Sequence, residues 1–313
     1  MSYIYKLNTN PNMEVINTNY DANLKLKMIN DKNLFLTLTH YSIHSPTSPW
    51  FIPNGGNTGI GNMLFQISSC IAFAIKNNAT LFVPGLKTFF NVEKLEKKNT
   101  IFRNINSECS EEYLKVKDNI IVSDPQKCIW DYEFSNNMNF HPYFENYRNF
   151  QDYRNVILKI FRPTRNDFEY IINKYPIILE NNICSIHVRL GPDYKKIYNE
   201  NKNRLKELED IYFKCIDHMI LEKNIRIFFV FTNDKNYCNH ILNNNPKYNN
   251  IRFVYSEERD YVDIWMISLI KNNITSVSTL AWWGSFLNEH TDKYILCCKG
   301  CRDDLHYPEW ITI

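Results

Sequence analysis

His187 and Arg189 are two basic residues that alternate with the apolar Ile186 and Val188. Side chains two residues apart on a β-strand point to the same face, so this spacing predicts that both basic groups share one face. A basic group in apolar surroundings needs a partner. A bound anion would provide one, because the planar guanidinium of Arg189 presents a fork of donors that matches phosphate oxygens. The pair therefore predicts a site for a phosphate-like anion.

Polar side chains also lie at or near the ends of the neighbouring predicted strands. Asn233 and Asp234 follow the strand expected to end at residue 232. Asp263 lies on the helix that follows the next strand, and Ser278 and Thr279 begin the helix after the strand expected at residues 274–277. A helix N-terminus with a hydroxyl would add backbone N–H donors to the same anion. Charge-assisted hydrogen bonds contribute roughly 1.5 to 3 kcal/mol each, enough for these donors and a guanidinium to hold a diphosphate without metal. Each residue also has a structural interpretation as a helix cap or a solvated first-turn acid.

The second half of the chain alternates between apolar runs and segments with helical spacing. Strands are expected at residues 183–188, 225–232, 251–255, 274–277 and 294–297. Helices are expected between them, at residues 205–219, 262–270 and 280–288. This alternation predicts a parallel sheet with crossover helices. Ligands of such sheets bind outside the carboxyl ends of the strands, which is where the polar residues lie.

The first half contains a shorter pattern of the same kind. Residues 33–39 and 80–83 are expected to be strands, and the glycine-rich residues 55–61 open a helix between them. The apolar face of that helix is formed by Leu64, Ile67, Ile71 and Ile75. A chain of 313 residues has the length of about two domains.

Composition excludes several classes of function. The net charge is only +2 and the basic residues are dispersed, so neither nucleic acid nor a membrane surface is an expected partner. No apolar run approaches the length of a transmembrane helix or a signal peptide, so a cytoplasmic location is expected. Nine cysteines at irregular positions favour free buried thiols. Cys297, Cys298 and Cys301 are an alternative zinc cluster, but no second pair of ligands follows at finger-like spacing.

Five segments, in this order, resemble motifs of the α-1,2-fucosyltransferase family (glycosyltransferase family 11). Gly59 to Gln66 is similar to the family's Gly-x-Gly-Asn-x-x-Phe-Gln signature, and His141 to Tyr147 is similar to its aromatic mid-chain segment. His187 to Arg189 matches the start of its His-x-Arg-Arg-Gly-Asp-Tyr motif. Phe231 to Asp234 resembles its Phe-Ser-Asp-Asp strand end, and Ser278 to Gly284 its Ser-Thr-Phe-Ser-Trp-Trp-Gly element. One glycine motif would be weak evidence, whereas five ordered matches are strong.

The resemblance implies an α/β, GT-B-like fold, with two Rossmann-like domains facing a cleft. It implies a donor, GDP-fucose, that is bound mainly by the C-terminal half without a metal or other cofactor. His187 would lie near guanine, Arg189 would hold the β-phosphate and act in catalysis, and Asp263 would bind guanine. Ser278 or Thr279 would reach the phosphate. The glycine loop, at Gly59 and Gly61, would close over the diphosphate from the other domain.

Two departures from the family motif affect the catalytic assignments. Leu190 replaces the second Arg, and Pro192 is inserted before Asp193, the carboxylate expected to deprotonate the acceptor. Glu200 is the reserve candidate for this base. Either lysine, at position 195 or 196, could supply the positive charge that the family's second Arg provides. The alternative interpretation is that both lysines belong to a solvated loop.

The sequence therefore predicts three parts and one leading function. Residues 1–50 form an N-terminal extension, 51–178 an acceptor-side domain and 179–313 the donor domain. The expected reaction is inverting transfer of L-fucose from GDP-fucose to a galactose-type hydroxyl of a glycan, in α-1,2 linkage. A different nucleotide-sugar and a catalytically inactive binding module on the same fold are the alternatives. An oxidoreductase is disfavoured because no Gly-x-Gly-x-x-Gly with a following acidic residue is present.

Overall fold

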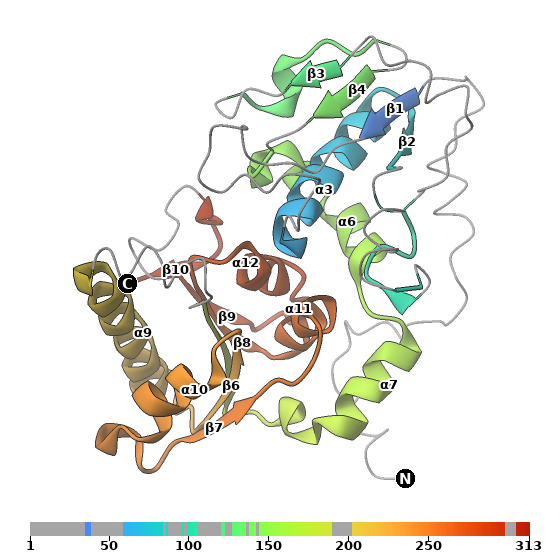
Figure 1. Cartoon of the computed structure of the whole chain (residues 1–313). Helices are drawn as coiled ribbons and strands as arrows, with labels where there is room; N and C mark the ends of the chain where they lie inside the picture. The colour runs from blue at the N-terminus through green and yellow to red at the C-terminus, as the bar shows by residue number, and fades with distance from the viewer. Residues whose placement is uncertain are drawn as a thin grey trace. The chain divides into compact units, whose positions relative to one another are not determined.

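The chain forms two compact units, each of which is described by itself. The computed structural model describes residues 35–38, 59–83, 86, 95–96, 99–105, 120–122, 127–135, 138–141, 144–189, 202–297 and 305–313. The N-terminal unit ends at Arg162, and the C-terminal unit runs from Pro163 to Ile313 (Figure 1). The roles of our predicted domains, and their boundaries at residues 50 and 178, stay predictions.

The N-terminal unit is built on a small parallel sheet. Its strands are β1 (Phe35–Leu38), β2 (Thr80–Phe82), β3 (Ile120–Val122) and β4 (Met138–His141), in the order β2-β1-β4-β3. The helix α3 (Ile60–Lys76) connects β1 to β2, as the spacing of its apolar residues predicted. Because β1 pairs with both β2 and β4, part of the predicted N-terminal extension belongs to this sheet.

The C-terminal unit is built on a six-stranded sheet in which all strands are parallel. In spatial order the strands are β10 (Ile311–Thr312), β9 (Tyr294–Cys297), β8 (Asn272–Thr275), β5 (Ile183–Val188), β6 (Ile227–Thr232) and β7 (Arg252–Tyr255). The parallel α/β architecture expected from the alternation of strands and helices is therefore confirmed.

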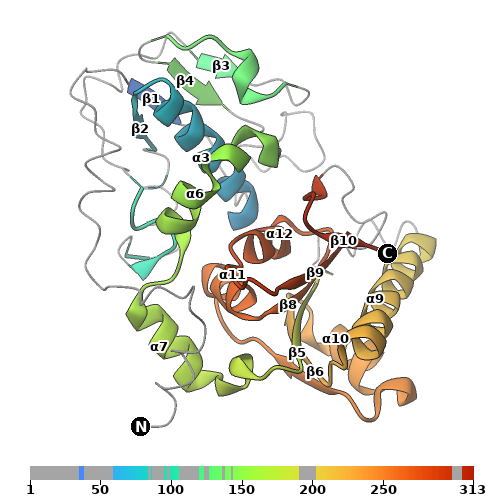
Figure 2. The same ribbon diagram turned by 180° about the vertical axis from the view of Figure 1, so that it is seen from behind.

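Helices cover both faces of this sheet. One face carries α9 (Lys202–Lys223) and α10 (Lys235–Cys238), and the other carries α11 (Asp260–Leu269) and α12 (Thr279–Phe286), as the two opposite views show (Figures 1 and 2). The connecting segments of the described chain are η2 (Ile129–Asp131), η3 (Tyr147–Asn149), η4 (Gln151–Tyr153), α6 (Arg154–Phe161), α7 (Arg165–Lys174), η5 (Pro176–Leu179), η6 (Asn239–Asn243) and η7 (Pro246–Tyr248).

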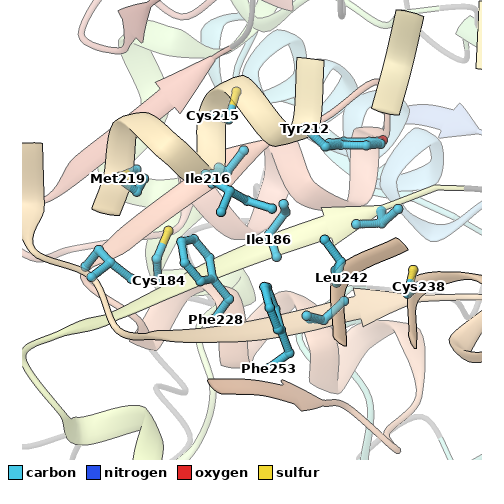
Figure 3. Packing of buried hydrophobic residues seen from close by; sticks show 14 of the residues in the cluster. Cys184, Ile186, Tyr212, Cys215, Ile216, Met219, Phe228, Cys238, Leu242 and Phe253 are labelled. Carbon is cyan, nitrogen blue, oxygen red and sulfur yellow. The ribbon is translucent and has the colours of Figure 1, made fainter. Parts of the chain in front are cut away.

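The face under α9 is an apolar core that fixes how β5 is oriented. Cys184, Ile186 and Val188 of β5 pack there with Tyr212 and Ile216 of α9 (Figure 3). Because side chains alternate along a strand, Ser185 and His187 are directed to the opposite face. The apolar residues of β5 thus determine the side on which its polar residues can act.

Some details differ from the sequence-based expectations. The strand expected at 274–277 begins two residues earlier, at Asn272, because both asparagines at its start are buried with their amides hydrogen-bonded. Ile75, expected on the apolar face of α3, is 36% exposed at the last turn of the helix. The expected free, buried thiols are found at Cys70, Cys184, Cys238 and Cys297, whereas Cys215 is disulfide-bonded, because spacing along the chain does not reveal proximity in space.

None of the helices in the described part of the chain has the length and apolar character needed to cross a membrane.

The contact between α11 and α12 depends on Gly284. A Cβ atom at this position would lie 2.5 Å from the Cβ and Cγ2 atoms of Ile267 and 3.2 Å from the carbonyl oxygen of Ile264. Distances of this kind require the two helices to move apart. The glycine of the Trp-Trp-Gly element therefore has a packing role, in that it lets the two helices approach closely.

We expect Gly284→Ala to lower the free energy of unfolding by about 1 to 3 kcal/mol, the usual cost of overpacking a core. Urea unfolding followed by circular dichroism would measure the change. The matched control is Ser285→Ala, because the buried Ser285 hydroxyl has no hydrogen-bond partner in the described part of the chain. Its removal should change stability by less than about 0.5 kcal/mol or increase it. Equal stabilities of the two variants would contradict the packing role.

Candidate functional site

The connectivity of the C-terminal sheet creates one point at which the strand order reverses. The chain proceeds outward from β5 through β6 to β7, and then returns to the other side of β5 to form β8, β9 and β10. The helices that follow β5 and β8, α9 and α12, therefore lie on opposite faces of the sheet. Ligands of open α/β sheets bind at such a switch point. The candidate site is thus the carboxyl end of β5 and β8.

His187 and Ser276 meet at this point. His187 lies in β5 and Ser276 directly follows β8, and both are buried, with 6% and 5% exposure. The Nδ1 atom of His187 lies 3.2 Å from the Ser276 hydroxyl oxygen. That oxygen also accepts a hydrogen bond of 3.2 Å from the backbone N–H of Ser278. The contact joins the predicted anion-binding histidine to the start of α12.

The hydrogen bonds of Ser276 are compatible with either neutral tautomer of His187. A hydroxyl oxygen has two lone pairs, so Ser276 can accept from the N–H of Ser278 and either donate to His187 Nδ1 or accept from it. Burial, together with the positive charge of Arg189, lowers the pKa of His187 to about 3, so the ring is neutral near pH 7. A neutral imidazole has one N–H donor and one nitrogen acceptor. His187 therefore offers an uncharged polar group at the end of β5.

The start of α12 is capped by a serine. Ser278 is the N-cap residue, and its hydroxyl accepts from the N–H of Leu280 at 3.2 Å. Thr279 is the first residue of the helix. The capping interpretation of Ser278 is therefore correct, and it does not exclude an anion at the same N-terminus, because a cap satisfies only part of the N–H groups of the first turn.

Asp263 lies on α11, near the carboxyl end of β7. Its Oδ1 atom accepts a hydrogen bond from the hydroxyl of Ser256, the residue that follows β7. Burial raises the pKa of Asp263 well above its usual value, and the negative charges of Asp260 and Glu258 raise it further. The Ser256 hydrogen bond acts in the opposite direction. Asp263 is thus a partly buried acid whose ionisation is opposed by most of its surroundings.

Asp234 has a structural role. Its carboxylate accepts from the N–H of Tyr237 at 3.1 Å and caps α10, and its own N–H donates to the Thr232 hydroxyl at 3.1 Å. Asn233 precedes it at the end of β6. The cap interpretation of this strand end is therefore sufficient for Asp234.

Gly59 and Gly61 lie at the start of α3, in the N-terminal unit. Gly59 is the N-cap residue, with φ −53°, no side-chain cap, and no atom within 4 Å of the position that a Cβ would occupy. Gly61 is buried in the first turn. Neither the backbone angle nor the space around it requires a glycine at position 59.

Several predicted residues lie outside the described residues. They are Leu190, Pro192, the catalytic candidate Asp193, Glu200, the lysines at positions 195 and 196, and two of the three clustered cysteines, Cys298 and Cys301. Cys297 is a free, buried cysteine at the end of β9. In the part of the chain that is described, no three His, Cys, Asp or Glu side chains are grouped as metal ligands.

Ser256 was not predicted from the sequence, and Ser276 was noted only as part of the polar strand end at residues 276–279, with no role of its own. Each is a single serine directly after a strand, a pattern too common to single out a functional residue. Their contacts depend on pairing between segments far apart in sequence, since His187 and Ser276 are 89 positions apart. Only the strand register brings them together.

No family model matches this chain. The α-1,2-colitosyltransferase of Escherichia coli is 24% identical over 257 residues, which cover 74% of this chain and 86% of that protein. The O-antigen biosynthesis glycosyltransferase WbnK of Escherichia coli is 30% identical over 205 residues, which cover 58% of this chain and 65% of that protein.

Among solved structures, the apo form of POFUT1 is similar over 86% of this chain and 99% of that chain, with 13% identity and a TM-score of 0.50. The complex of POFUT1 with GDP-fucose also gives a TM-score of 0.50, with 12% identity. This likeness concerns the fold, and it confirms the α/β, GT-B-like class expected from the sequence. Both curated relatives are named as glycosyltransferases, and the chain is accordingly a glycosyltransferase.

Proposed function

We propose that this glycosyltransferase transfers L-fucose from GDP-fucose to a galactose-type hydroxyl of a glycan, in α-1,2 linkage, with inversion and without a metal ion. The observation that carries the proposal is the junction of β5, β8 and α12, where His187, Ser276 and the start of a helix meet. The α-1,2 linkage is supported by the name of the relative that is 24% identical.

The donor's diphosphate is assigned to this junction. Arg189 follows β5 directly, and Ser278 and Thr279 begin α12 with its positive helix end. His187, which the family resemblance placed near guanine, lies two residues before Arg189, and we therefore assign it to the diphosphate instead. An anion with several oxygens can accept from several of these groups and also balance the positive charge of Arg189.

In the transfer step the acceptor oxygen forms a bond to the anomeric carbon of fucose, and the bond from that carbon to the β-phosphate oxygen breaks. Negative charge develops on the departing GDP, and fixed donors that face this charge lower the barrier. Arg189 is assigned this catalytic role. The acceptor's proton passes to a base, for which Asp193 remains the candidate and Glu200 the reserve.

Asp263 is assigned to the guanine base. A carboxylate can accept from the two adjacent N–H groups of guanine at the same time. Strands β5 and β7 are two positions apart in the sheet, or about 10 Å, which is a suitable distance between the phosphates and the base of one nucleotide. For Gly59 and Gly61, at the start of α3, the donor-binding role that the family resemblance implies stays a prediction.

A second candidate is transfer of colitose, because a relative bears the name of a colitosyltransferase. The same diphosphate and guanine assignments would apply to a GDP-linked form of that sugar. The two candidates differ only in the hydroxyls around the sugar, so a comparison of donors separates them.

A donor screen tests the function. We expect GDP, GDP-fucose and GDP-mannose to raise the melting temperature, with slow hydrolysis of GDP-fucose, while UDP-sugars have no effect. Rates in EDTA should equal those in buffer. Stabilisation by UDP-sugars alone would disprove the guanine assignment. Faster hydrolysis of GDP-colitose than of GDP-fucose would select the second candidate, and loss of activity in EDTA would disprove metal independence.

Arg189→Lys keeps the positive charge and removes the bidentate fork. We expect kcat to fall by about tenfold or more, which corresponds to about 1.4 kcal/mol of lost transition-state stabilisation, while the protein remains folded. The matched control is Arg252→Lys. Arg252 is exposed and begins β7, so it lies at the amino ends of the strands, whereas the site lies at their carboxyl ends. Steady-state rates with GDP-fucose would measure both. Unchanged turnover of Arg189→Lys would remove this side chain from the leaving group.

A further inference from the structure

Two serines of the C-terminal unit form the same local structure at neighbouring parts of the site. Ser276 follows β8 and Ser256 follows β7. In each case the serine oxygen accepts from the backbone N–H two residues later, Ser278 or Glu258, at 3.2 Å. Such a turn fixes the hydroxyl and leaves its hydrogen for another acceptor. The hydroxyl of Ser276 is hydrogen-bonded to His187, and that of Ser256 donates to Asp263.

We propose that Ser256 is a positioning residue for nucleotide-base recognition, because its hydroxyl holds Asp263 as an oriented carboxylate that faces the base. This inference rests on the proposed GDP-sugar donor. It adds a residue that neither the sequence motifs nor the family resemblance included.

The contacts of Asp263 support this role. In the described part of the chain, the Ser256 hydroxyl is the one hydrogen-bond donor to its carboxyl group. The other polarisable group near this hydroxyl is the sulfur of Met266 at 4.0 Å, a weaker acceptor. One oxygen of Asp263 is thus held by Ser256, and the second oxygen remains available to a ligand.

Ser256 is in turn held by a cluster around Glu258. The Glu258 carboxylate accepts from the hydroxyls of Tyr170 at 3.1 Å and Tyr175 at 3.0 Å, and it forms an ion pair with Lys174. Its side chain is only 9% exposed. These contacts attach the loop after β7 to α7 and the segment that follows it. The backbone N–H that positions Ser256 therefore belongs to a residue that cannot move freely.

The charge state of Asp263 decides which base it can bind. An ionised carboxylate accepts two N–H groups and so matches guanine, whereas a neutral carboxyl has one donor and matches a base edge with one donor and one acceptor. Burial and the charges of Asp260 and Glu258 favour the neutral form. Lys174 faces Glu258 and partly balances its charge. Donation by Ser256 favours the ionised form and hence guanine.

The test is the pH dependence of GDP affinity, measured by calorimetry on the full chain between pH 5 and 8.5. GDP should bind more weakly as the pH falls, because Asp263 becomes protonated. In Ser256→Ala the midpoint should move to higher pH by about one unit, with an affinity about tenfold lower where Asp263 is partly protonated. Ser256→Thr retains the hydroxyl and should restore the wild-type profile.

Two controls separate this role from a loss of stability. Ser268→Ala removes a buried hydroxyl from the same helix, where it donates to the Trp265 carbonyl at 2.7 Å, and it should leave the pH profile unchanged. Asp263→Asn should bind GDP weakly, and the pH dependence that it retains, which comes from the phosphate of GDP, is the baseline for the other profiles. If Ser256→Ala does not fold, Ser256→Cys is the substitute, because its side chain has a similar volume and its thiol is a weaker hydrogen-bond donor. It should shift the pH midpoint of GDP affinity in the same direction.

The outcomes distinguish the inference from the function on which it rests. If the wild-type chain binds GDP and Ser256→Ala, or Ser256→Cys, shows the same pH midpoint as the wild-type chain, the role of Ser256 is overturned and the donor assignment stays intact. Absence of GDP binding by the wild-type chain at every pH would overturn both. If Ser268→Ala shifts the pH midpoint as much as Ser256→Ala does, the shift is a general effect of losing a buried hydroxyl, and the inference is also overturned.

Discussion

The pairing of β5 with β8 is the constraint on which the candidate site depends. Buried amides help to hold its register, because Asn272 donates to the carbonyl of Ile183 at 3.0 Å and Asn273 donates to the Ser185 hydroxyl at 2.7 Å. With Ile186 opposite Ile274, His187 reaches Ser276 beyond the end of the ladder. A slip by one residue would reverse the faces of β5 and direct His187 into the apolar core under α9.

The two faces of the C-terminal sheet differ in the polarity of their buried side chains. The face under α9 is apolar and supplies burial, whereas the face under α11 and α12 contains hydrogen-bonded polar groups. Asn273 donates to two carbonyl oxygens at the end of α11, and Asn288 donates to Asn273 at 2.8 Å. Because these buried amides have partners, they do not carry the cost of unsatisfied polar groups. The polar face can therefore extend to the strand ends, where a ligand is expected.

Much of the C-terminal fold could be predicted from the sequence, because it follows from local patterns. Strands β5 and β9 have the expected bounds, and the alternation of Ile186 with His187 gave the correct face. The start of β8 was missed because Asn272 and Asn273 look like loop residues until their distant partners are known. Helix α7 was also missed, although its Lys174 holds the loop beside Asp263 through Glu258.

The central claim is that a nucleotide diphosphate binds where β5, β8 and α12 meet, and amide hydrogen exchange with and without GDP tests it most directly. Our account predicts slower exchange in peptides that span residues 187–189, 256–263 and 276–282, and no change in the middle of α9, which covers the opposite face. GDP binding that protects other segments and leaves residues 276–282 unchanged would contradict it.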